Sequence, residues 1–173
     1  YLSKNLNYLK QNTIGGYLLS CIGDDRQYGC MLSKYGNTPS DKAIIMAFKS
    51  LKIKFKKYSF LRRTADERQY NSPGIDLPIA CIYRSRDGAY PEYHTSLDDF
   101  NLVTESGVKG GFNVAKTAIN ILLKKIIPQN KILCEPKMDK RNLYHSSSAN
   151  KTKKIYQHYL NFLQYADGKN DLE

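Results

Sequence analysis

The sequence has few of the residues from which metal sites and disulfide frameworks are built. It holds three histidines and four cysteines in 173 residues, and no C-x-x-C pair occurs. The cysteines stand at positions 21, 30, 81 and 134, and two of them, Cys21 and Cys81, lie within apolar, strand-like runs. We therefore expect reduced core cysteines in an intracellular, cytoplasmic protein, not a disulfide framework or a zinc knuckle.

Long apolar segments are also missing. No run of 18 apolar residues occurs, so the sequence predicts no membrane-spanning helix and no membrane partner. The chain begins with a polar, helix-like segment, YLSKNLNYLKQN, where a signal peptide or an initiator methionine would stand. Because this segment looks like the middle of an element, we expect the chain to be a fragment that is truncated at its N-terminal side.

Basic residues outnumber acidic ones. The chain has 27 Lys and Arg against 16 Asp and Glu, which gives a formal net charge of +11 and an isoelectric point near 9.4. Such a charge permits binding to nucleic acid or to another anionic surface. The lysines are dispersed, however, and no base-reading motif accompanies them. A biased composition rich in Lys, Asn, Ile and Tyr explains the charge more simply.

Strand-like and helix-like segments alternate along the first 128 residues. This alternation predicts an α/β fold, with a mixed, mostly parallel sheet and helices on both faces. The apolar run at 16–23, bounded by glycines, is typical of a central strand covered on both faces. Helices are expected over 1–11, 38–51 and 104–127, and further strands over 28–35, 54–60 and 77–84. The predicted buried face of the last helix comprises Val108, Phe112, Ala115, Ile119, Leu122 and Ile126.

The densest set of reactive side chains lies between residues 62 and 99. Asp66 and Glu67 precede the strand at 77–84, and His94 follows it, between a Tyr and a Thr. Two polar clusters at the ends of one strand are a common way to bring an acid and a histidine to one site. This setting is typical of a histidine that binds a metal through one ring nitrogen while a neighbouring group holds the other. The alternative is a half-exposed loop histidine without a function.

Three segments carry a resemblance to a known family. D-E-R-Q-Y-N-S-P-G at 66–74, L-P at 77–78 and Y-P-E-Y-H-T-S at 90–96 resemble a bacterial, aminopeptidase-like branch of the zinc aminopeptidases, which often accompanies polysaccharide biosynthesis genes. Its wider relatives include secreted aminopeptidases and glutaminyl cyclases, with S-D-H, G-I/V-P and Y/W-H-T segments. The resemblance covers roughly residues 1–145. The chain departs from the wider pattern at Glu67, where a His is usual, and at Ala65, where a Ser is frequent.

The resemblance implies roles for individual residues. His94 would be a zinc ligand, and Asp66 a buried acid beside the metal and the substrate amine. The resemblance further implies one zinc ion in the full-length parent, with the remaining ligands and the catalytic base upstream of this chain. Ser20 stands where two-zinc relatives carry an aspartate ligand, and Asp24 or Asp25 is a weaker candidate. The catalytic candidates are Asp66 and Glu67, the substrate-binding candidates Arg68, Tyr70 and Tyr93, and the metal ligand His94.

Two functions from different classes remain open. The first is the C-terminal half of a zinc-dependent aminopeptidase-like hydrolase, residues 1–128, acting on a peptide-like or amine-containing small substrate and inactive as this chain alone. The alternative is a non-catalytic binding or regulatory protein on the same fold. The polar composition after Ile127 predicts a linker at 129–150, and the resemblance implies, at 151–173, the start of a winged-helix module that could bind nucleic acid. A helix that docks back on the main domain is the alternative for the tail.

Overall fold

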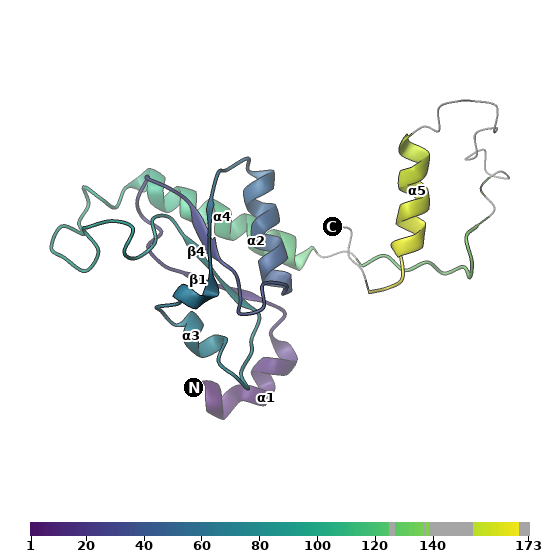
Figure 1. Ribbon diagram of the computed structural model, residues 1–173, viewed down its shortest axis with the longest axis horizontal. Helices are drawn as coiled ribbons and strands as arrows, with labels where there is room; N and C mark the ends of the chain where they lie inside the picture. The colour runs from purple at the N-terminus through teal and green to yellow at the C-terminus, as the bar shows by residue number, and fades with distance from the viewer. Residues whose placement is uncertain (125–126, 137, 139–153, 170–173) are drawn as a thin grey trace. The chain divides into compact units, whose positions relative to one another are not determined.

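The computed structural model describes residues 1–124, 127–136, 138 and 154–169 (Figure 1). The chain divides into two units, Tyr1–Lys124 and Lys125–Glu173. In the first unit the elements are α1 (Leu2–Asn12), β1 (Gly16–Leu19), β2 (Gly29–Met31), α2 (Pro39–Ser50), β3 (Lys56–Tyr58), the 3-10 helix η1 (Phe60–Arg62), α3 (Glu67–Tyr70), β4 (Ile79–Tyr83) and α4 (Glu105–Leu123). The second unit contains α5 (Lys154–Tyr165).

The four strands form one mixed sheet in the order β1-β4-β2-β3. β1 runs parallel to β4 and β2 runs parallel to β3, whereas β4 and β2 are antiparallel. The predicted α/β class with a mixed, mostly parallel sheet is therefore confirmed. The expected central position of the first strand is wrong for the described sheet, because β1 lies at its edge and pairs there with β4 alone. Its last residue, Leu19, is exposed.

Helices cover both faces of the sheet because the side chains of β2 and β4 alternate. Cys30 and Ile82 point to one face, where they pack with apolar residues of α2 and α4. Met31, Cys81 and Tyr83 point to the other face, where η1 and α3 lie. Figure 1 shows the strands between the pair α2 and α4 and the shorter α3. β4 is buried on both sides and is the central element of this unit.

The start of α2 follows from its sequence. Thr38 caps the helix, and its side chain and that of Asp41 form a reciprocal capping box. The Asp41 carboxylate is buried and also accepts hydrogen bonds from the backbone N–H of Ser33 at 2.6 Å and from the Ser33 hydroxyl at 2.5 Å. One acidic side chain thus caps the helix and fixes the loop that follows β2.

The buried face of α4 differs from the predicted one. Val108, Phe112 and Ile119 are exposed, although the apolar pattern placed them in the core, and Ile126 lies outside the described residues. The helix instead turns its small residues inward, because a Cβ at Gly107 would lie 1.9 Å from the carbonyl oxygen of Gly23. Close approach of the helix to the loop after β1 therefore outweighs burial of the larger side chains. The residues buried on α4 are Gly107, Gly111, Val114, Ala115 and Ala118.

In the second unit, the segment before α5 pairs with the segment after it. Gln129 and Asp167 form an isolated antiparallel bridge, and the N–H of Asn130 donates to the carbonyl of Ala166 at 2.7 Å. Within the expected linker, residues 137 and 139–150 lie outside the described residues. Across the part of the chain that the structure describes, no helix is both long enough and apolar enough to cross a bilayer.

Candidate active site

The candidate site lies where β1 and β4 end. Because these strands are parallel, the loops that follow them, 20–28 and 84–104, leave the same edge of the sheet. The buried carboxylate of Asp24 joins the two loops. It accepts hydrogen bonds from the Ser85 hydroxyl and the Ser85 N–H, both at 2.7 Å, and from the N–H of Arg26 at 2.8 Å. Asp24, a weaker candidate for a metal ligand, thus has both oxygens engaged in hydrogen bonds.

A second contact fastens the segment that carries His94. The guanidinium of Arg26 donates to both carboxylate oxygens of Glu92, at 2.9 and 2.7 Å. This bidentate pair lowers the pKa of Glu92 to about 2 from its ordinary value of 4.5. The Thr95 hydroxyl donates in turn to the carbonyl of Glu92 at 2.7 Å. The segment around His94 is therefore held to the loop after β1.

One aromatic ring stacks on His94 in this segment. The imidazole stacks on the Tyr93 ring with centroids 4.0 Å apart, and Tyr93 meets the buried Tyr90 edge to face at 5.8 Å. His94 is exposed and its backbone is left-handed, with φ of 57°. Burial raises the pKa values of Tyr90 and Tyr93. Cys21, which lies beside Tyr90 and was expected to be buried, is only half-buried because β1 ends before it.

The second predicted cluster stands at the start of α3. The expectation of a buried acid at position 66 is wrong, because Asp66 precedes the first turn of α3 and is exposed, whereas the next residue, Glu67, is buried. One oxygen of Glu67 accepts hydrogen bonds from the N–H groups of Thr64 and Ala65, at 2.7 and 3.0 Å. Its other oxygen is buried and has no hydrogen-bond partner among the described residues. Glu67 thus fixes the turn from which Asp66 projects.

The two other predicted residues of this cluster lie on α3 itself. Arg68 is exposed, and its Nε donates to the carbonyl of Ala65 at 3.2 Å. Tyr70 is half-buried. No hydrogen bond, ion pair or ring contact joins either side chain to His94 among the described residues.

Residues 62–64 and 86–87 connect the two clusters. The Thr64 hydroxyl donates to one oxygen of Asp87 at 3.0 Å, and the Arg86 guanidinium donates to the other at 3.1 Å. Arg86 also donates to the carbonyl of Arg62. Between Asp66 and His94 themselves, no hydrogen bond or ion pair occurs within the described residues. The structure thus joins the segments but does not show the two predicted side chains in contact.

Sequence reasoning missed the contacts that build this edge of the sheet. The Thr104 and Ser106 hydroxyls donate to the carboxylate of Asp25, which lowers its pKa. Arg84 is buried, and its guanidinium lies 3.8 Å from the centroid of the Tyr28 ring. A local signal exists for Asp24, since an Asp often accepts from the backbone N–H two residues later. Its bonds to Ser85, 61 positions away, have no such signal.

The described residues do not complete a metal site by themselves. No group of three or more His, Cys, Asp or Glu side chains that could hold a metal ion occurs among them. Zinc sites in hydrolases use about three protein ligands together with an open position for water. Exposed His94 offers one nitrogen ligand, so a zinc ion here would need ligands from outside the described residues.

Comparisons with known proteins place the chain in a family. The model of a family described as a "domain of unknown function (DUF4910)" matches residues 1–125. The chain belongs to this family. A second family model, described as "winged helix-turn-helix", matches residues 125–172, which supports the predicted winged-helix tail.

Two relatives give this family a context. A Clostridium acetobutylicum protein, provisionally named a polysaccharide biosynthesis protein with an aminopeptidase-like domain, is 28% identical over 99% of this chain. A crystal structure of a protein provisionally named a peptidase, from the same organism, has a TM-score of 0.73 and 26% identity over 99% of this chain. The chain spans 40% of the first protein and 37% of the second. These similarities support the resemblance to aminopeptidase-like proteins.

Proposed function

We propose that this chain is part of a zinc-dependent aminopeptidase-like hydrolase, to which it contributes one metal ligand, His94, and part of the substrate pocket. The names of the two relatives support a peptidase-like domain. The observation that carries the proposal is the conformation of His94. Its side chain is exposed, its backbone is left-handed, and the Arg26–Glu92 pair holds the segment in which it lies. Such a conformation costs about 1 kcal/mol or more outside glycine and is found preferentially at functional sites.

The exposed carboxylate of Asp66 orders the amine of the substrate in this proposal. Asp66 has no hydrogen-bond partner for its side chain among the described residues, so it is available to a ligand. Glu67 shapes the pocket by holding the turn at residues 64 and 65. Arg68, Tyr70 and Tyr93 line it, which suits a peptide-like or amine-containing small substrate.

Zinc, when bound, would supply an activated water for hydrolysis of a peptide or amide bond. Because the described residues offer only one imidazole ligand at this place, the other ligands and the base come from outside them. We therefore infer that the 173-residue chain alone neither holds zinc tightly nor hydrolyses a substrate. The proposal includes a cytoplasmic location, where cysteine thiols stay reduced.

Metal content tests the proposal. Zinc would be measured by mass spectrometry in the full-length protein, in its His94→Ala variant and in a His158→Ala control. His158 is exposed on α5 in the second unit and has no proposed role. We expect about one zinc ion in the wild type and in the control, and a loss of at least about tenfold in His94→Ala. Equal zinc in all three proteins would refute the role of His94.

The winged helix-turn-helix match supports a second candidate function. Modules of this class are used in nucleic-acid recognition, and the net charge of +11 favours a polyanion. A non-catalytic, regulatory protein would then bind duplex DNA through residues 125–172. Binding to a DNA duplex that weakens steeply with salt, together with no zinc in the full-length protein, would favour this candidate over the first.

A further inference from the structure

Exposed cations gather at the edge of the sheet that β3 forms. Although lysines are dispersed over the whole sequence, they occupy five of the nine residues at 49–57, and no acidic residue occurs between Asp41 and Asp66. In the described sheet β3 is the last strand and pairs with β2 alone. We call the exposed cations of this segment the basic edge; they are Lys49, Lys52, Lys54, Lys56, Lys57 and Arg63.

The cations within β3 lie on both faces of the sheet. Lys57 stands beside Cys30 in the strand register, so its side chain is on the face that α2 and α4 cover. Lys56 is on the other face, where its ammonium group lies 5.4 Å from the centroid of the Tyr58 ring. The edge is therefore positive from both sides.

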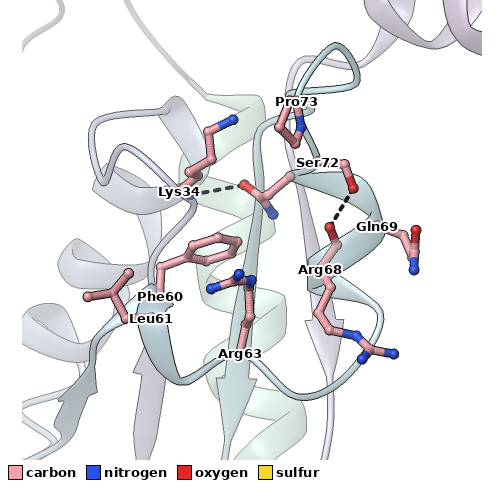
Figure 2. Close-up of a pocket in the computed structure, with 9 residues that line it drawn as sticks. Lys34, Phe60, Leu61, Arg63, Arg68, Gln69, Ser72 and Pro73 are labelled. Carbon is pink, nitrogen blue, oxygen red and sulfur yellow. Dashed lines mark hydrogen bonds between the residues drawn. The ribbon is translucent and has the colours of Figure 1, made fainter.

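The segment after β3 continues this positive surface. Figure 2 shows the guanidinium of Arg63 beside the Phe60 ring, whose centroid is 5.3 Å away, whereas Arg68 on α3 is directed away from both. Phe60 packs in the same apolar cluster as Tyr58. Arg63 and Lys56 thus lie on aromatic rings of one cluster, and Arg68 is not part of the basic edge.

The cations of the basic edge are not neutralised by carboxylates of the described residues. None of the six forms an ion pair with an Asp or Glu there. Arg26, Lys34 and Lys109, in contrast, each form one. Six like charges within one short segment repel one another, so a bound polyanion would relieve this repulsion.

Protection of the sheet edge explains only part of this charge. Lysines on an edge strand prevent its pairing with a strand of another molecule, and Lys56 and Lys57 are placed to do so. Lys49, Lys52 and Lys54 precede β3 and do not guard its hydrogen-bonding groups. The positive charge therefore extends beyond what the edge needs.

The size and chemistry of the surface fit the backbone of duplex DNA. Residues 52–57 span at most about 20 Å, a length over which the duplex carries about ten phosphate charges. Lysine is a flexible point charge that contacts phosphates without reading bases, so this mode of binding needs no base-reading motif. The winged helix-turn-helix match at 125–172 makes DNA the polyanion that the chain supports best.

We propose that the basic edge binds the phosphate backbone of duplex DNA without sequence preference. The surface lies in the first unit and is additional to residues 125–172. The choice of DNA as the partner rests on the winged-helix candidate function, whereas neither zinc nor hydrolysis is required.

The salt dependence of DNA binding by the full-length protein tests the proposal. Fluorescence anisotropy with a duplex of about 20 base pairs would be followed between roughly 50 and 200 mM salt. The variant combines Lys52→Gln, Lys54→Gln and Lys56→Gln. Because each phosphate contact contributes about 0.9 to the slope of log affinity against log salt, the slope should fall by about 2–3. Affinity at about 100 mM salt should fall at least tenfold, and Lys54→Gln alone should lower the slope by about 1.

A control variant removes the same charge elsewhere in the first unit. It combines Lys4→Gln, Lys10→Gln and Lys116→Gln, at exposed positions on α1 and α4, and its slope should stay that of the wild type. Equal losses in the two triple variants would show general attraction by net charge and overturn the basic edge.

The remaining outcomes separate this proposal from the winged-helix candidate. DNA binding with an unchanged slope in the basic-edge variants would overturn the basic edge and leave that candidate intact. No DNA binding by the wild type at micromolar concentration would overturn both. Binding to phosphatidylserine vesicles but not to DNA would overturn the choice of partner and assign the edge to a membrane surface.

Discussion

The replacement Asp24→Asn tests how the loops of the candidate site are held together. The asparagine side chain would keep the shape of the aspartate but would have one acceptor oxygen in place of two. In either orientation its NH₂ group faces a backbone donor, the N–H of Ser85 when it replaces Oδ2 and the N–H of Arg26 when it replaces Oδ1. Hydrogen bonds to a charged group are worth about 1.5–3 kcal/mol each. We therefore expect a loss of about 2–3 kcal/mol in the free energy of unfolding.

Thermal unfolding followed by circular dichroism measures this loss. In a unit of this size the expected change lowers Tm by about 10 °C. Ser85→Ala, which removes only the hydroxyl donor, should cost about 1–2 kcal/mol. Asp25→Asn is the matched control, because Asp25 is exposed and its partners among the described residues are two hydroxyls and Arg84, so its shift should be much smaller. Equal shifts for Asp24→Asn and Asp25→Asn would refute the claim that the Asp24 carboxylate joins the loops.

Two further predictions follow from burial and from the ion pair. In native thiol labelling, Cys134 should react fastest because it is exposed, whereas Cys30 and Cys81 should be slow, since burial raises both pKa values to about 12; fast labelling of Cys81 would contradict the buried position of β4. The stabilising contribution of the lowered Glu92 pKa is full above pH 4.5 and is lost as the pH falls toward 2. An NMR titration of Glu92 should therefore show a midpoint near 2 that returns toward 4.5 in Arg26→Ala, and an ordinary midpoint in the wild type would argue against the pair.

Local signals in the sequence predicted much of the fold. The Thr38–Asp41 cap gives the start of α2, and the apolar run around Cys81 gives the central strand β4, because both depend on neighbouring residues. The buried face of α4 could not be predicted from its apolar pattern. That face depends on the contact between Gly107 and the Gly23 carbonyl, which the fold creates between distant segments.

The candidate site was predictable only in part. The motif placed His94 on the loop after β4, but its left-handed backbone and its fastening through Glu92 depend on Arg26, 66 positions away from that glutamate. The burial of Glu67 likewise depends on its fit against β4, which no spacing rule contains. Motifs thus identify side chains that could take part in chemistry, whereas long-range hydrogen bonds decide the exposure and conformation of each one.

Anomalous X-ray scattering at the zinc edge, from crystals of the full-length protein, tests the central claim most directly. We predict a peak at about 2.0–2.1 Å from a ring nitrogen of His94, with the remaining ligands from outside residues 1–124. The peak should be absent from crystals of His94→Ala and present in those of His158→Ala. A zinc peak in the wild type that lies away from His94, or crystals grown with zinc that show no peak in this unit, would contradict the assignment.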